Sequence, residues 1–249
     1  LEHRRQRQMC IRDRVTADPC YMSLVNVASA LGASWKPIKL DKNFEHDLDK
    51  MNSAIDSQTK LVYITNPNNP TATVTNGKHL FEFCADVSDR VPVFVDEAYL
   101  ELTQLGLKNS MAKLISQGKD VIVTRTFSKI HGMAGLRLGY MLASPDRINE
   151  INKITRGGMG ISGPTIQAAM SSLDDTNFLN SCKTKIACLL SLIVFVKFNT
   201  YLIPVNEPTT IDITTGITTI FDLSFSAIFI FTCLANYIFS MIFFLIYSC

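Results

Sequence analysis

Three short polar motifs contain residue types that react with aldehydes and bind phosphate. They read NPNNPT (66–71), DEAY (96–99) and TFSK (126–129). A lysine amine that loses its proton in a desolvated setting can form a Schiff base with an aldehyde, and Lys129 supplies such an amine. The hydroxyls of Thr126 and Ser128 and the guanidinium of Arg137 suit a phosphate group, the last through charge-assisted hydrogen bonds. The motifs therefore indicate a phosphorylated aldehyde.

The acid of the second motif narrows this chemistry to one cofactor. Pyridoxal 5'-phosphate is an aldehyde that needs both a lysine and an acid beside its pyridine nitrogen. Asp96 can supply the acid, since an ionised carboxylate keeps the ring nitrogen protonated. Asn69 and Tyr99 can hydrogen-bond the phenolic oxygen of the ring. The sequence therefore predicts a pyridoxal phosphate site in which Lys129, Asp96 and Tyr99 are the catalytic residues.

Each motif follows a segment with the pattern of a buried parallel strand. These segments, 61–65, 91–96 and 120–126, are short and rich in β-branched residues. Helix-like stretches occupy 19–31 (closed by Gly32), 44–55, 76–89 and 109–117, and Ser144-Pro145-Asp146 has the composition of a helix start. This alternation predicts an α/β fold, a three-layer sandwich with a mostly parallel sheet. Because ligands of such sheets bind beyond the carboxyl ends of strands, the three motifs can face one pocket.

In this order, the motifs resemble fold-type I, class I/II pyridoxal-phosphate-dependent aminotransferases. With the downstream GLRLGY (135–140), they look most like the histidinol-phosphate aminotransferase group. The resemblance covers about residues 15–180. It implies that Lys129 bonds to the cofactor and later shuttles the proton, that Asp96 pairs with the pyridine nitrogen, and that Asn69 and Tyr99 contact the phenolic oxygen.

The same resemblance places the remaining cofactor contacts. It implies that Thr126, Ser128 and Arg137 hold the phosphate, and that Tyr21 of ADPCY stacks on the ring. The implied reaction transfers an amino group from histidinol phosphate or a related amino acid to a 2-oxo acid, in a cytoplasmic homodimer. Two alternatives stay open: another fold-type I activity such as decarboxylation, and a non-catalytic truncated or chimeric fragment.

The sequence departs from the family pattern at three places. Ala72 stands where the family usually has a glycine, which would ease a tight turn. Nothing before Val15 matches the family's Gly-rich phosphate turn. No arginine follows Arg156 to bind a substrate carboxylate. We therefore expect the resemblance to be incomplete at both ends.

Composition divides the chain into three segments. Residues 1–14 are arginine-rich, and we interpret them as a non-native or disordered basic segment. Residues 15–185 have the composition of a partial pyridoxal-phosphate-binding large domain. Residues 186–249 form an apolar tail, unrelated to that domain, which we interpret as frameshifted sequence. Because 223–247 holds no Lys, Arg, Asp or Glu, a membrane-spanning segment is the alternative.

Overall composition excludes several other classes. A net charge of +2 gives no basic surface for nucleic acid. Seven cysteines without a CxxC pair, and four histidines without ligand spacing, argue against a disulfide framework and a metal site. No GxGxxG follows a strand, which excludes a dinucleotide-binding protein. The predicted partners are therefore a small amino donor and a 2-oxo acid.

Overall fold

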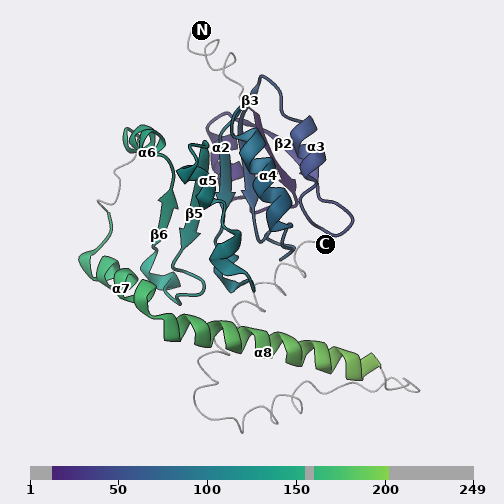
Figure 1. Cartoon of the computed structure of the whole chain (residues 1–249), viewed down its shortest axis with the longest axis vertical. Helices are drawn as coiled ribbons and strands as arrows, with labels where there is room; N and C mark the ends of the chain where they lie inside the picture. The colour runs from purple at the N-terminus through teal and green to yellow at the C-terminus, as the bar shows by residue number, and fades with distance from the viewer. Residues whose placement is uncertain (1–12, 155–159, 202–249) are drawn as a thin grey trace. The chain divides into compact units, whose positions relative to one another are not determined.

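One six-stranded sheet organises the chain. A computed structural model describes residues 13–154 and 160–201, with side chains as far as Cys188. The sheet order is β2-β1-β3-β4-β5-β6 (Figure 1). Its strands are β1 (Asp13–Asp18), β2 (Ser34–Lys39), β3 (Thr59–Thr65), β4 (Val93–Asp96), β5 (Val121–Thr126) and β6 (Gly139–Leu142). The first five are parallel, and β6 is antiparallel to β5, which confirms the predicted α/β class.

The described residues also form helices between and after the strands. They are α2 (Ser23–Ala30), α3 (Leu48–Ser53), α4 (Gly77–Val87), α5 (Ala112–Ser116), α6 (Pro145–Asn152), α7 (Gly163–Asp174) and α8 (Thr176–Tyr201). The helices α3, α4 and α5 cover one face (Figure 1), where Leu80 and Leu114 pack on Val62 and Val93. The alternate strand positions point the other way, and there Tyr63 packs in a second cluster with α2.

The predicted helices are shorter in the structure than expected from the sequence. The stretch predicted at 44–55 begins only at Leu48, because Phe44 has a left-handed φ of 61°. The Asp47 side chain caps this helix by accepting from the Lys50 amide at 3.1 Å. The stretch predicted at 19–31 begins at Ser23, and Gly32 follows its end with a φ of 87°, as expected for a glycine stop.

Ser144 confirms a predicted helix start. Its hydroxyl accepts from the Arg147 amide at 3.3 Å, and Pro145 opens α6. Strands β1, β2 and β6, by contrast, were not predicted. Strand β2 contains Pro37, which is tolerated because this strand lies at the sheet edge. Strand β1 begins at Asp13, so the last two residues of the predicted segment 1–14 belong to this strand.

Parts of the sequence interpretation lie outside the described residues. They are residues 1–12 and the tail from 202, including the apolar stretch 223–247. The boundary drawn between 185 and 186 falls inside the continuous helix α8. Among the described residues, no helix, α8 included, has the length and apolar composition to cross a bilayer.

His46 is a buried titratable group beneath the α3–α4 side of the fold. Its Nδ1 lies 2.8 Å from the Thr75 hydroxyl, and its ring is 5% exposed. Burial lowers the pKa of His46 to about 4, because the charged ring would lose its hydration. Because the pKa of His46 in the folded chain lies below the usual 6.5, the neutral ring favours the folded state above pH 6.5. This contribution to the free energy of unfolding is lost as the pH falls toward 4.

We expect His46→Asn to remove much of this acid sensitivity. The amide oxygen of asparagine can replace Nδ1 beside Thr75 but does not titrate. Between pH 7 and pH 5 the unmodified chain should lose about 2 kcal/mol more unfolding free energy than the variant. Urea unfolding at the two pH values measures this difference. Equal losses in both proteins would contradict the assignment.

Candidate active site

A cavity of about 680 Å³ lies at the carboxyl ends of the parallel strands. Thr65, Asp96 and Thr126, the last residues of β3, β4 and β5, all line it. The structure brings every predicted site residue to this cavity: Tyr21, Asn69, Asp96, Tyr99, Thr126, Ser128, Lys129 and Arg137. Parallel strands present their carboxyl ends at one sheet edge, which explains why motifs far apart in sequence meet here.

Asp96 lies in a row of polar side chains across the cavity floor. It pairs in register with Thr65 on β3 and with Thr124 on β5, so the three side chains share one sheet face. Its carboxylate accepts from the Ala98 amide at 3.0 Å. Burial raises the pKa of Asp96 above its usual range, against the opposing effects of the Ala98 amide, the Thr124 hydroxyl and the Lys129 charge.

Lys129 lies in the turn after β5, with its amine directed at Tyr99. Its Nζ is 4.8 Å from the centre of the Tyr99 ring, a cation–π distance. The side chain is exposed, so the sequence-based expectation of a desolvated lysine is wrong for this structure. The physical reason is that Lys129 stands three residues beyond the last residue of β5, at the open side of the cavity.

The third motif gathers hydroxyls and a guanidinium. The Thr126 hydroxyl oxygen accepts from the Ser128 amide at 3.0 Å and lies 3.4 Å from the Leu138 carbonyl. Arg137 has a left-handed φ of 52° and donates from Nη1 to the Ala134 carbonyl at 2.7 Å. Its guanidinium is exposed, which leaves further N–H groups for an anion.

A hydrogen bond between two loops positions Asn69 and Tyr21, the last two of the predicted site residues. Asn68 donates from Nδ2 to the Pro19 carbonyl at 3.2 Å, which joins the loop after β3 to the loop after β1. Asn69 follows Asn68 in the first of these loops, and Tyr21 lies two residues after Pro19 in the second. Both residues line the cavity. Tyr21 is 44% exposed, so one face of its ring is available for stacking.

Beside the cavity, which Arg125 lines, lies a buried ion pair that the sequence did not predict. Glu97 accepts from Arg125 Nε at 3.0 Å and from the Met111 amide at 2.7 Å, and Ser110 donates to both of its oxygens. Burial raises the pKa of Glu97 against these partners. Because Glu97 follows Asp96 and Arg125 precedes Thr126, the pair holds two motif segments together.

Two further residues contribute contacts at or near the cavity. Tyr140 lines the cavity, and its hydroxyl lies 3.4 Å from Arg125 Nη1. His131 is buried. Its Nδ1 lies 2.8 Å from the Ser172 hydroxyl on α7, and its Nε2 lies 3.6 Å from a Glu101 carboxylate oxygen. It therefore joins the Lys129 turn to α7.

Ala72 adopts the conformation that glycine favours. Its φ is 58°, and its amide donates to the Asn68 carbonyl at 2.9 Å, which closes the turn of the first motif. A Cβ in the left-handed region costs roughly 1–2 kcal/mol. Ala72 therefore strains the turn at a position where a glycine would not.

Comparison with known proteins identifies the family of this chain. The family model for aminotransferase class I and II matches residues 11–190. The chain therefore belongs to the aminotransferase class I and II family. It spans about half the length of the relatives it matches first, which are histidinol-phosphate aminotransferases.

Individual relatives likewise match this chain over only part of their own length. The histidinol-phosphate aminotransferase of Bacillus subtilis strain 168 is 39% identical over 168 residues, which cover 68% of this chain and 46% of that protein. An aromatic amino acid aminotransferase of Mycolicibacterium smegmatis is 42% identical over 113 residues, or 45% of this chain and 31% of that protein. The Sinorhizobium meliloti histidinol-phosphate aminotransferase, solved with pyridoxal-5'-phosphate, has a TM-score of 0.63, 26% identity, and coverage of 71% of this chain and 47% of that one.

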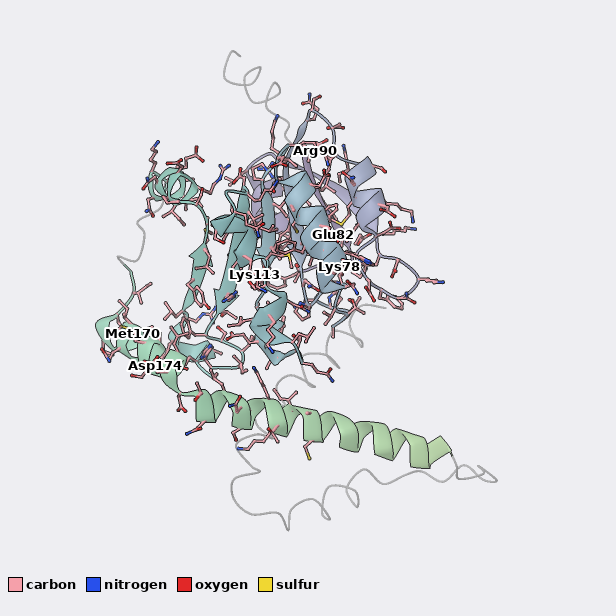
Figure 2. The ribbon with its side chains drawn as sticks, viewed as in Figure 1. Lys78, Glu82, Arg90, Lys113, Met170 and Asp174 are labelled. Atoms are coloured by element: carbon pink, nitrogen blue, oxygen red, sulfur yellow. The ribbon has the colours of Figure 1, made fainter. Side chains whose placement is uncertain are left out.

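We expect Asp96→Asn to stabilise the chain in the absence of any ligand. The pKa of Asp96 is raised from the usual 3.8, so its contribution favours folding below pH 3.8 and becomes unfavourable as the pH rises through the folded pKa. The thermal midpoint of the variant should exceed that of the unmodified chain at pH 7, and the gain should shrink toward acidic pH. Asp174→Asn, at an exposed position of α7 (Figure 2), is the matched control and should change little. A lower midpoint for Asp96→Asn at pH 7 would contradict this account.

Ala72→Gly should also stabilise the fold. Relief of the left-handed strain outweighs the extra backbone entropy of glycine, for a net gain of about 1 kcal/mol. As a control, Ala85→Gly inside α4 should lose about 0.5–1 kcal/mol, because helical φ needs no glycine. Urea unfolding measures both changes, and a loss of stability in Ala72→Gly would refute the strain.

Proposed function

We propose that this chain carries the cofactor site and catalytic residues of a pyridoxal-phosphate-dependent aminotransferase. One observation supports this proposal most strongly. Eight residues selected for that chemistry, from Tyr21 to Arg137, line a single cavity at the carboxyl ends of β3, β4 and β5. Motif order alone does not require that arrangement, because side chains at strand ends can also point to opposite sheet faces.

The residues of the cavity fit the cofactor group by group. Lys129 offers an exposed amine, and Asp96 offers a carboxylate on the cavity floor. Thr126, Ser128 and Arg137 offer hydroxyls and a guanidinium for a phosphate. When bound, pyridoxal phosphate supplies an electron-withdrawing ring that stabilises negative charge on the α-carbon of an amino acid.

Each residue then has a defined task. Asp96 would pair with the ring nitrogen, and its carboxylate form would favour a proton there and keep the ring electron-poor. Asn69 and Tyr99 orient the ring by hydrogen bonds to its phenolic oxygen, and Tyr21 covers one ring face. The Lys129 amine would take up the proton from the donor's α-carbon.

We propose histidinol phosphate or a related amino acid as the donor and a 2-oxo acid as the acceptor. Relatives named for histidinol phosphate and for aromatic amino acids both support a donor of this class. Donor and acceptor would use the same site in turn, which predicts ping-pong kinetics. Steady-state rates at varied concentrations of both substrates test this order, since intersecting double-reciprocal lines would contradict it.

We also propose that the assembled enzyme is a homodimer, as the family resemblance implies. The exposed apolar residues Ile166, Met170 and Leu173 follow one face of α7 and support association (Met170 in Figure 2). Light scattering of the purified chain measures its mass directly, and a concentration-independent monomer would contradict this part of the proposal.

Lys129→Ala tests the proposed function. Pyridoxal phosphate added to the unmodified chain should give a visible absorption band distinct from that of the free cofactor, because the cofactor bonds to the Lys129 amine. The variant should lack this band and should have no transaminase turnover. Lys113→Ala on α5 (Figure 2), whose side chain is outside the cavity, is the control and should keep the band. The same band in Lys129→Ala, or turnover by that variant, would exclude the assigned role.

A further inference from the structure

The last residue of β3 carries a buried hydroxyl without a hydrogen-bond partner. Thr65 is 2% exposed, and its Oγ1 has no partner within the described part of the chain. The nearby Tyr63 phenol is close enough for Thr65 to influence its pKa, but the two groups do not reach hydrogen-bonding geometry. A buried hydroxyl left unpaired costs about 1–3 kcal/mol.

The position of Thr65 suggests what its hydroxyl is for. Thr65 lines the cavity and pairs in register with Asp96, whose carboxylate belongs to the same sheet face. The Thr124 hydroxyl lies on the other side of Asp96 and already interacts with its carboxylate. Two threonines therefore flank Asp96, and among the described residues the hydroxyl of the one on β3 has no hydrogen-bond partner, the Asp96 carboxylate included.

We propose that Thr65 is a further cofactor-binding residue, whose hydroxyl pairs with the pyridoxal phosphate at the end that Asp96 binds. This inference rests on the proposed function. The unpaired hydroxyl costs free energy in the folded chain, and a hydrogen bond to the cofactor would remove that cost. Valine at this position would remove the cost and the binding contact together.

The chain offers a matched control on the same sheet. Thr16 of β1 is 1% exposed, and its Oγ1 likewise has no hydrogen-bond partner among the described residues, although it influences the neighbouring Cys20 thiol. Unlike Thr65, it does not line the cavity. Thr16→Val therefore removes the same kind of group without touching the ligand site.

The experiment compares the unmodified chain with Thr65→Val, Thr65→Ser and Thr16→Val. Thermal midpoints without ligand should rise by about 2–4 °C in both valine variants, because each loses an unpaired buried hydroxyl. Titration with pyridoxal phosphate should show a dissociation constant about three- to tenfold higher for Thr65→Val, the size of one hydrogen bond. Thr65→Ser keeps the hydroxyl and should keep the affinity, as should Thr16→Val.

Each other outcome has a definite meaning. Unchanged affinity in Thr65→Val, with binding by the unmodified chain, overturns the role of Thr65 and leaves the proposed function intact. A lower midpoint with weaker binding in both Thr65 variants assigns Thr65 a structural role and overturns the inference. No binding by the unmodified chain refutes the proposed function, and the inference falls with it.

Discussion

The parallel register of β3, β4 and β5 is the constraint on which this site depends. Hydrogen-bonded parallel strands place Thr65, Asp96 and Thr124 side by side on one face, and they bring the following loops to one edge. The Glu97–Arg125 pair reinforces this arrangement, since it links the residue after Asp96 to the residue before Thr126. Breaking such a buried pair typically costs about 3–5 kcal/mol, so the distance between β4 and β5 is strongly determined at this level.

The site is assembled from groups that work against the stability of the fold. Asp96 is held in a setting that raises the pKa of its carboxyl, Ala72 is strained, and Thr65 leaves a hydroxyl unpaired. The apolar packing of α3, α4 and α5 on the opposite face of the sheet offsets these costs. The stabilising and the functional residues lie in different places. The hydrophobic core packs on one face of the sheet, and the predicted site residues lie at the carboxyl ends of its strands. A site that binds a charged, aromatic ligand needs polar groups that only the ligand fully satisfies.

Sequence reasoning predicted the elements whose signals are local. The strands 61–65, 91–96 and 120–126 carried β-branched runs, and Ser144-Pro145 carried a helix start; all four are present. Strand β2 was not predicted because its pattern is interrupted by Pro37, and a tertiary edge position makes that proline acceptable. The polar residues missed at the site, Thr65, Thr124 and Arg125, have no motif of their own. Their importance comes from strand register, which a single sequence does not specify, and the exposure of Lys129 likewise depends on the fold.

Chemical trapping of the cofactor tests the central claim most directly. The purified chain is incubated with pyridoxal phosphate, reduced with borohydride, digested, and examined by mass spectrometry. If the cavity is the cofactor site, the mass of the reduced cofactor should lie on the peptide that contains Lys129, and Asp96→Asn or Arg137→Ala should reduce its yield. Label spread over the surface lysines, or concentrated on a lysine outside the cavity such as Lys113 or Lys119, would contradict the account.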